Sequence, residues 1–458
     1  MKYISTRNSS KEYTFEEVFI KGLADDGGLF IPKSLKKFSE EELSLLSKLS
    51  YKNLAKKIIF PFIKDFMSEE ELSDIVNKSY SLFRKENVVD VIKIGDTNIL
   101  ELFHGPTLAF KDVAMQLLGN FYGHFLKKNN KNINVVVATS GDTGAAAIEA
   151  IKGRENMNIF VLHPNKKISV VQRKLMSTVK EKNVFNIAIE GNFDDCQNLV
   201  KSLFSDREFS NSINMSGVNS INWARIIAQA VYYFYTFFLV KNKKKTNFSV
   251  PTGNFGDVYA GYLSKKMGLP INKLLVATNL NDILHRAISN GKYEAKDVSE
   301  TISPSMDIQI ASNFERLIFD LTNQDDFETK NIMNEITKEG KYIISREKLE
   351  KIQNDFLSSS MNETEVLNTI KEVYKKYKII LDPHTAIGFG VLEKTNLEGN
   401  NIVLATAHPS KFPEAIYSSI NIKPSLPKEL RYILDEKEKF VIIENSLNKL
   451  KKYIIDKV

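Results

Sequence analysis

The sequence predicts an α/β protein whose mostly parallel sheets are covered by helices on both faces. Short β-branched runs alternate with helical segments over the middle of the chain. Several runs end in a loop of small residues, as in "NVVVATSGDTG" from Asn134. The 458 residues, 43% of them hydrophobic, can bury a core large enough for two or three domains. Ligands of such folds bind at the carboxyl ends of the strands, where these loops lie.

The first of these units places a strand at Asn134 to Thr139, a loop at Ser140 to Gly144 and a helix from Ala145 onward. "TNFSVPTGNFGDVYAGYLSKKMG", Thr246 to Gly268, repeats the order, and its helix ends at a glycine suited to the C′ position. Further strands are expected at Leu274 to Thr278 and Ile402 to Thr406. The Lys/Glu-rich stretch 323–376 predicts exposed amphipathic helices.

Residues 1 to about 90 predict a helix-rich accessory domain, with a tight turn in "LADDGGLFIP", Leu23 to Pro32. The apolar run Ile226 to Val240 is too short and too polar to span a bilayer, so we expect a buried helix and no membrane partner. The single cysteine, Cys196, fits a reducing compartment such as the cytoplasm.

The charge pattern argues against nucleic acid as a partner. The net charge of +7 arises from 63 basic residues spread among 56 acidic ones. The dense basic runs, "KNKKKT" at Lys241 to Thr246 and the C-terminal "KLKKY", are short and are expected to be solvated. The six histidines show no HxxxH or CxxC pairing, so no protein-built metal site is expected.

Lys111 stands in "ELFHGPTLAFKDVAMQLLGNF", with apolar residues on both sides. If this segment is buried, the ammonium group has few water partners, and burial favours the neutral amine. A lysine of this kind suits imine chemistry and proton transfer. The alternative is a core lysine whose charged end reaches solvent.

The loop "PTGNFGD", Pro251 to Asp257, lies between a predicted strand and a predicted helix. Its glycines permit a tight backbone, and the N–H groups at a helix start can hold a phosphate without a cationic side chain. A purely structural turn is the alternative. The loop is not GxGxxG, and the chain has no GxxxxGK[ST], so neither a Rossmann dinucleotide site nor a P-loop is favoured.

Three other loops carry polar groups at predicted strand ends or helix starts. "TSGDTG", Thr139 to Gly144, suits a carboxylate but is also a good N-cap sequence. "GVNSINWARI", Gly217 to Ile226, places amides and a hydroxyl before Arg225 and suits a second phosphoryl group, or else forms a cap beside a surface arginine. "VLATAHPSKFPEAI" brings Thr406 to a strand end, with His408 just beyond. A buried lysine, a phosphate loop and a carboxylate loop are together the parts needed to bind pyridoxal phosphate as a Schiff base.

Seven stretches in chain order resemble a known family: "GLADDGGLFIP", "LFHGPTLAFKD", "ATSGDTGAA", "HPNKKIS", "NSINWARI", "PTGNFGD" and "ATAHPSKF". They resemble threonine synthase, a fold-type II pyridoxal-phosphate-dependent family similar to the tryptophan synthase β chain, in its longer bacterial and fungal form. The resemblance implies an N-terminal accessory domain over 1–90, a cofactor-binding region of two interleaved α/β lobes over 91–430, and a C-terminal helical and strand segment over 431–458.

The resemblance also implies the roles of individual residues, with Lys111 as the catalytic lysine that carries the cofactor. The other cofactor-binding residues are Asp142 near the 3-hydroxyl group, Gly253, Asn254, Phe255, Gly256 and Asp257 around the phosphate, and Thr406 facing the pyridine nitrogen. Ser140 and Thr143 would meet the substrate carboxylate, and Lys167, Asn219, Ser220 and Arg225 the substrate phosphate. Two positions depart from the pattern: related enzymes often have asparagine in place of Asp142, and the family usually has glycine in place of Lys166.

The implied reaction converts O-phospho-L-homoserine and water into L-threonine and phosphate, the last step of threonine biosynthesis, in a monomer or homodimer. A threonine-synthase-like phospholyase that releases 2-oxobutyrate and ammonia is the alternative, and the cluster ending at Arg225 argues against simple dehydratases.

A non-catalytic basic binding protein is a rival suggested by the net charge. A Ser–Lys acylase is suggested by "STVK" at Ser177 to Lys180, but no SDN or KTG partner is present.

Overall fold

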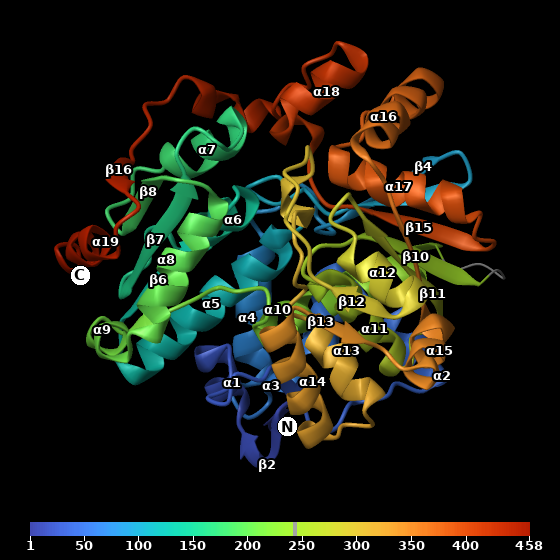
Figure 1. Ribbon diagram of the computed structural model, residues 1–458, viewed down its shortest axis with the longest axis horizontal. Coiled ribbons are helices and arrows are strands. Elements are labelled where there is room, and N and C mark those ends of the chain that lie inside the picture. The colour runs from blue at the N-terminus through green and yellow to red at the C-terminus, as the bar shows by residue number, and fades with distance from the viewer. Residues whose placement is uncertain (241–244) are drawn as a thin grey trace.

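The computed structural model describes residues 1–240 and 245–458. Residues 241–244, which make up most of the "KNKKKT" run, lie outside the described residues, so the expected exposure of that run is not tested there. The two largest sheets, of five and six strands, are flanked by helices (Figure 1). The five-stranded sheet lies on the left of that view and the six-stranded sheet on the right, and the blue N-terminal elements lie below. The predicted α/β class with parallel sheets is confirmed.

The five-stranded sheet has the order β16-β8-β7-β6-β9, and all its pairs are parallel. Its strands are β6 (Ile133–Ala138), β7 (Met157–Pro164), β8 (Val184–Glu190), β9 (Met215–Ser216) and β16 (Val441–Glu444). Red β16 comes from the C-terminal end of the chain and lies beside green β8 (Figure 1).

Alternate residues of β6 and β7 enter different clusters of the core, as expected for a sheet covered on both faces. Val136 and Phe160 pack with α8 and α19, whereas Val135 and Ile159 belong to the main core with α5 and α6. The helices here are α5 (Lys111–Asn129), α6 (Asp142–Ile151), α7 (Val170–Ser177), α8 (Phe193–Ser205), α9 (Arg207–Ser212) and α19 (Leu447–Ile455).

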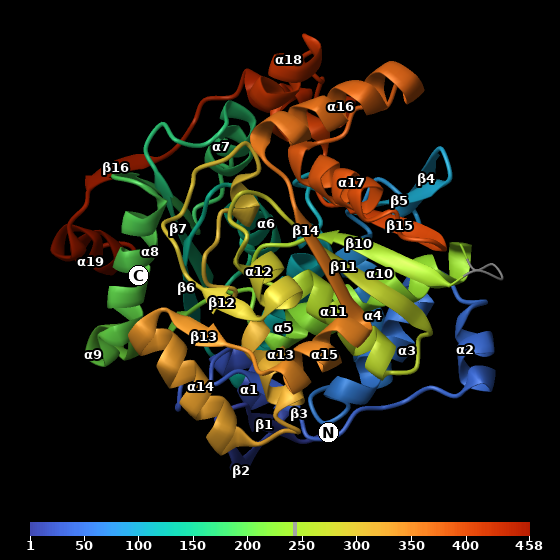
Figure 2. The same ribbon diagram turned by 45° about the vertical axis from the view of Figure 1, so that its right-hand side comes forward.

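The six-stranded sheet has the order β14-β11-β10-β15-β5-β4 and is parallel except for β4, which pairs antiparallel with β5. Its strands are β4 (Asp90–Ile94), β5 (Thr97–Glu101), β10 (Thr246–Pro251), β11 (Ile271–Thr278), β14 (Phe356–Ser360) and β15 (Asn400–Ala405). One face is covered by α11 (Gly256–Lys266), with α10 (Trp223–Val240) against it, and the other by α17 (Pro383–Thr395), with α16 (Glu363–Tyr377) against it (Figure 2).

The strands predicted from β-branched runs are present, with ends that differ by a few residues: β6, β11 and β15 match the predictions at 134–139, 274–278 and 402–406. The predicted buried helix at 226–240 lies within α10, whose side chains are buried from Trp223 to Phe237. No helix among the described residues has the length and apolar character needed to cross a membrane.

The N-terminal part contains the expected helices, α1 (Phe15–Lys21), α2 (Glu40–Leu46), α3 (Tyr51–Ile63) and α4 (Glu69–Tyr80). Capping boxes begin three of them, because Thr14, Ser39 and Ser68 each have a glutamate three residues later. A three-stranded sheet was not predicted: β1 (Tyr3–Ser5), β2 (Asn8–Tyr13) and β3 (Phe30–Pro32). Its strands are short, and β2 is polar and largely exposed, so no periodic pattern marks them.

The stretch 323–376 forms the expected helices α14 (Asp326–Glu339), α15 (Arg346–Asp355) and α16, but it also contains two strands. β13 (Lys341–Ile343) pairs with β12 (Lys292–Glu294), and serine-rich β14 pairs with β11 at the edge of the six-stranded sheet. The remaining elements are α12 (Ile283–Asn290), α13 (Phe314–Leu321), α18 (Pro413–Ile420), and the 3-10 helices η1 (Pro304–Met306), η2 (Pro409–Lys411) and η3 (Lys428–Leu434).

Candidate active site

Lys111 is the first residue of α5 and is only 8% exposed, so the burial expected from its apolar neighbours is confirmed. Close packing of α5 on α6 places it here: Gly119 lies so near the carbonyl group of Ala150 that a side chain would not fit. Burial lowers the pKa of Lys111 to about 8, and the neighbouring cations Lys411 and Arg225 add to this effect, against the opposing effect of the Asp142 carboxylate.

Asp142, the first residue of α6, is the anion beside this lysine. Its Oδ2 atom lies 3.6 Å from Lys111 Nζ, and the Ser305 hydroxyl lies 3.3 Å from Nζ and 3.4 Å from Oδ2. Its Oδ1 atom accepts from Lys411 Nζ at 2.6 Å and from Gln172 Nε2 at 2.9 Å. Burial alone would raise the pKa of Asp142, but Lys411 and Lys111 outweigh burial and hold that pKa well below its usual value. Asp142 is therefore ionised.

The "PTGNFGD" loop joins the end of β10 to the start of α11. Phe255 has φ 63° in the left-handed region, and its buried ring packs against Phe314 and Phe356. The Asn254 carbonyl accepts from the backbone and side chain of Asn313, at 3.1 Å each. The backbone N–H groups of residues 253–257 donate no hydrogen bond to any described residue. Free N–H groups at a helix start are the requirement for binding a phosphate.

η1 closes against this loop. A Cβ atom at Gly253 would lie 2.7 Å from the carbonyl oxygen of Ser305, so only glycine allows the approach. Ser305 thus contacts both the "PTGNFGD" loop and Lys111, so the loop and the lysine lie close together.

The side chain of Asp257 faces α10 rather than the free N–H groups. The hydroxyl groups of Tyr232 and Tyr233 donate to its Oδ1 atom at 2.6 and 2.9 Å. Burial raises the pKa of this carboxyl group to about 6, against the lowering effect of the two tyrosines. Only the backbone of Asp257 is therefore available to a phosphate.

Arg225 is a buried cation on α10 near the lysine. Its Nη1 donates to the Val218 carbonyl at 3.0 Å, while its buried Nε has no partner among the described residues. Burial lowers its pKa to about 10. Asn219 is exposed and Ser220 half-buried, and the Ser220 carbonyl accepts from Asn313 Nδ2 at 3.4 Å. A guanidinium group with an unused N–H and no anionic partner among the described residues fits an oxyanion.

Two strand ends carry three further predicted residues, Thr406, Ser140 and Thr143. Thr406 follows β15, its carbonyl accepts from Phe110 N at 2.8 Å, and Ala407 bridges to Ala109, so it adjoins the lysine turn. In the "TSGDTG" loop the Thr139 hydroxyl accepts from the N–H groups of residues 141 and 144 at 2.9 Å. Half-buried Ser140 and Thr143 are left without a side-chain hydrogen bond to a described residue.

Comparison with known proteins agrees with this geometry. Three family models match the chain: threonine synthase N terminus over residues 2–80, pyridoxal-phosphate dependent enzyme over 100–345, and threonine synthase, C-terminal, over 385–454. The threonine synthase of Pseudomonas aeruginosa is 42% identical to this chain, and the alignment covers 99% of this chain and 98% of the relative. That of Saccharomyces cerevisiae is 43% identical, with 99% of this chain and 97% of the relative covered. The chain belongs to the threonine synthase family. A pyridoxal-phosphate-bound threonine synthase from Brucella melitensis superposes with a TM-score of 0.96 at 43% identity, covering 100% of this chain and 99% of that one.

This threonine synthase family member is a pyridoxal-phosphate-dependent enzyme, and its residues fit the cofactor. The buried amine of Lys111 has a lowered pKa, which imine formation needs. The free N–H groups of residues 253–257 can hold a phosphate. Both features lie beside Ser305.

One predicted residue of the threonine synthase pattern, Lys167, has no hydrogen bond or ion pair to the cluster within the described residues. Lys167 is exposed and has no ion pair within the described residues. Lys166, which stands where the family usually has glycine, has φ 61°, so the backbone keeps a glycine-like conformation despite the substitution. The functional roles of the individual residues stay predictions.

Sequence reasoning missed several residues of the site. Lys411 lies in the quoted "ATAHPSKF" motif but received no role, although a lysine followed by "FPEAI" could have been questioned as Lys111 was. Ser305 lies in "TISPSMDI", where a proline between two serines marks a turn. Gln172 and Asn313 carry no local signal, since their partners are distant in sequence.

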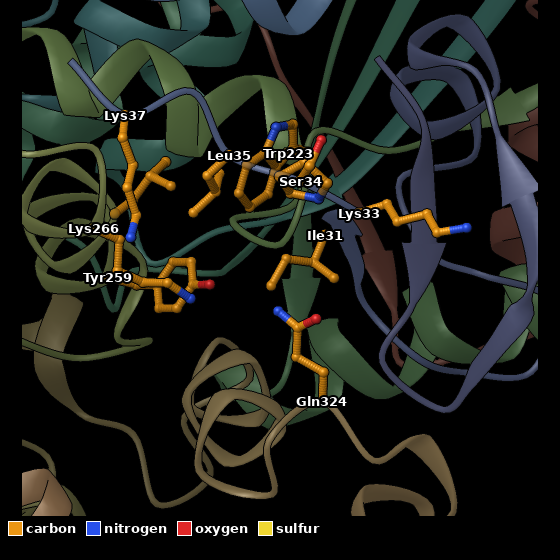
Figure 3. A pocket seen from close by; sticks show the side chains of 11 residues that line it. Ile31, Lys33, Ser34, Leu35, Lys37, Trp223, Tyr259, Lys266 and Gln324 are labelled. Atoms are coloured by element: carbon orange, nitrogen blue, oxygen red, sulfur yellow. The ribbon is translucent and has the colours of Figure 1, made fainter. Parts of the chain in front are cut away.

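A separate surface pocket lies where the chain after β3 passes over α10 and α11 (Figure 3). Its lining includes Ile31, Lys37, Tyr259 and Gln324. None of the predicted site residues lines it. The predicted site is the cluster around Lys111, and this pocket is not part of that prediction.

Proposed function

We propose that this site converts O-phospho-L-homoserine and water into L-threonine and phosphate. The observation that carries the proposal is a pair of separate anion-binding features beside one buried lysine. The free N–H groups of residues 253–257 form the first, and the unpaired guanidinium of Arg225 forms the second. The cofactor has one phosphate group, so the second feature indicates a substrate with a phosphate of its own.

When bound, pyridoxal phosphate supplies an electron-withdrawing ring that stabilises negative charge on the substrate carbons. Lys111 moves protons for this chemistry. An amine with a pKa of about 8 exists in both protonation forms near neutral pH, so Nζ can accept a proton and return it. Asp142 orients the ammonium form, and Thr406, a neutral hydroxyl, does not force a proton onto the cofactor ring as a carboxylate would.

The substrate is held at its two charged ends. We assign its carboxylate to Ser140 and Thr143, whose hydroxyls are unused at the start of α6. We assign its phosphate to Arg225 with Asn219 and Ser220, because a guanidinium fork stabilises the charge that grows on a departing phosphate. Lys167 is assigned to the same phosphate by its motif alone.

A fold-type II assignment and a cytoplasmic location belong to the same proposal. Parallel sheets with the lysine, the phosphate loop and the carboxylate loop at their carboxyl ends support the first. The single buried and free cysteine, Cys196, suits a reducing compartment and supports the second.

The decisive experiment is a product assay on the purified protein with O-phospho-L-homoserine. We expect one threonine and one phosphate for each substrate consumed, and no turnover by Lys111→Ala. If 2-oxobutyrate and ammonia are the main organic products, the chain is a phospholyase and the proposal is wrong.

A further inference from the structure

Lys411 is a second buried lysine beside the first, and its side chain is 0% exposed. It ends η2, and its Nζ contacts Asp142 Oδ1 at 2.6 Å and the Thr107 carbonyl at 2.8 Å. A buried ammonium group is costly unless it is paired and hydrogen-bonded. The proposed reaction assigns it no proton and no substrate contact, so its presence needs another explanation.

The surroundings of Lys411 fix the orientation of the Asp142 carboxylate. Lys411 and Gln172 both donate to Oδ1, which leaves Oδ2 for Lys111 and Ser305. The backbone of Lys411 is held as well, because the Ser169 hydroxyl donates to its carbonyl at 2.9 Å. Each carboxylate oxygen thus has its own set of partners.

The ion pair also joins the two sheets at the site. Asp142 follows β6 of the five-stranded sheet, and Lys411 follows β15 of the six-stranded sheet. Lys111 begins α5, which packs on both α6 and α10. The distance from Asp142 to Lys111 therefore depends on contacts between the sheets. Among the described residues, the Lys411 ion pair at 2.6 Å is the shorter of the two ion pairs that this carboxylate makes.

We propose that Lys411 is a positioning residue that compensates part of the Asp142 charge and directs its Oδ2 atom to Lys111, so that the Asp142–Lys411 pair sets the proton affinity of Lys111. The inference rests on the proposed function in one respect, namely that Lys111 carries the cofactor.

The charges around this cluster define the expected sign. The charged groups that interact within the Lys111–Asp142–Lys411 cluster come from four helices: Lys111 and Asp112 on α5, Asp142 on α6, Arg225 on α10 and His384 on α17. Asp112 accepts from Thr107 N and Oγ1 at 2.8 and 2.6 Å, so it is engaged elsewhere. Removing the positive charge of Lys411 leaves Asp142 free to stabilise the Lys111 ammonium more strongly, which raises the proton affinity of Lys111.

The test follows cofactor capture by the full-length protein. Resolved, cofactor-free protein is mixed with pyridoxal phosphate at a series of pH values, and the growth rate of the visible absorbance band is recorded. Capture needs the neutral amine, so the pH of half-maximal rate reports the proton affinity of Lys111. We expect Lys411→Met to raise that pH by about one unit or more. Lys411→Arg, which keeps the charge, and Lys394→Met, which breaks the exposed pair with Glu365, should leave it unchanged.

A second pair of variants separates positioning from a general structural effect. In an Asp142→Asn background, Lys411→Met should change the half-maximal pH less than it does in the natural sequence. If Lys411→Met alone fails to fold, the double variant is expected to fold, because it removes the two opposite charges of this buried pair together. Its half-maximal pH should then lie within about half a unit of that of the natural protein.

The outcomes are distinct. The inference is overturned if the half-maximal pH of Lys411→Met is unchanged or lowered, or if the substitution has an equal effect in both backgrounds. In either case the visible cofactor band still forms, so the proposed function stands. An unfolded double variant, or one outside the stated range, also overturns it. A natural protein that develops no visible band at any pH contradicts the proposed function itself.

Discussion

The carbonyl oxygen of Ser305 lies against Gly253, where a Cβ atom would come within 2.7 Å of it. This contact places η1 over the loop whose free N–H groups we assign to the cofactor phosphate. Because the obstructing atom belongs to the backbone, it cannot turn aside as a flexible side chain could.

Gly253→Ala is therefore expected to weaken cofactor binding. The added methyl group must displace either η1 or the loop, so we expect the Kd for pyridoxal phosphate to rise by about tenfold or more. Titration of cofactor-free protein by visible absorbance measures it. Gly123→Ala in α5 is the matched control, because its Cβ would meet only the end of the Arg154 side chain. Equal affinity in Gly253→Ala and the natural protein would contradict the assignment of this loop.

Arg225→Met is expected to impair binding of the phosphorylated substrate. It removes the unpaired guanidinium group, so we expect KM to rise by about a hundredfold, equivalent to roughly 3 kcal/mol for a charge-assisted contact. Steady-state kinetics at saturating cofactor measure the effect, and Arg346→Met at an exposed pair serves as the control. If KM is unchanged, Arg225 does not hold the substrate phosphate.

Asp257→Asn should change the pH dependence of stability. The pKa of Asp257 is raised to about 6 in the folded protein, so its stabilising contribution is present at low pH and is lost as pH rises through about 6. Asparagine has no such ionisation and keeps an oxygen for the tyrosine donors. The free energy of unfolding of Asp257→Asn relative to the natural protein should therefore increase by about 1.4 kcal/mol between pH 5 and pH 8. Denaturant unfolding of cofactor-free protein tests this, and a difference that does not vary with pH would show that Asp257 is ionised throughout.

Arg316→Met is expected to destabilise the fold near both anion-binding loops. Arg316 is fully buried and donates to the carbonyl groups of Phe30 in β3 and Ile221 before α10, and to the side chain of Asn313. Methionine would leave these acceptors unsatisfied, so we expect a loss of about 3 kcal/mol in the free energy of unfolding. Denaturant unfolding measures it; a loss below about 1 kcal/mol would show that the three contacts are replaced by water.

The sequence predicted the parts of the site that depend on local patterns. Lys111 was found because apolar residues surround it in the chain, and the loop at 253–257 because glycines separate a strand from a helix. Their closeness in space follows from parallel strands that end at a common edge. The edge strand β14 was missed because "FLSSS" is short and serine-rich, and its pairing with β11 is a tertiary contact.

The partners of Asp142 could not be predicted in this way. Ser305 and Lys411 are separated from it by more than 160 residues of sequence, and a lysine or serine in a loop is ordinarily solvated. Even the resemblance, which included the motif around Lys411, did not indicate that its charge is buried. Only the folded structure shows that this lysine lies opposite Asp142 and not in solvent.

The central claim is that Lys111, and not its buried neighbour Lys411, carries the cofactor. The direct measurement is borohydride reduction of the cofactor-loaded protein, followed by proteolysis and mass spectrometry of the labelled peptide. Reduction fixes the cofactor to the lysine that holds it. We predict a single phosphopyridoxyl group on Lys111. In a tryptic digest this residue lies in the peptide that begins after Lys93. Stoichiometric label on Lys411 or on any other lysine, with Lys111 unmodified, would contradict this account of the site.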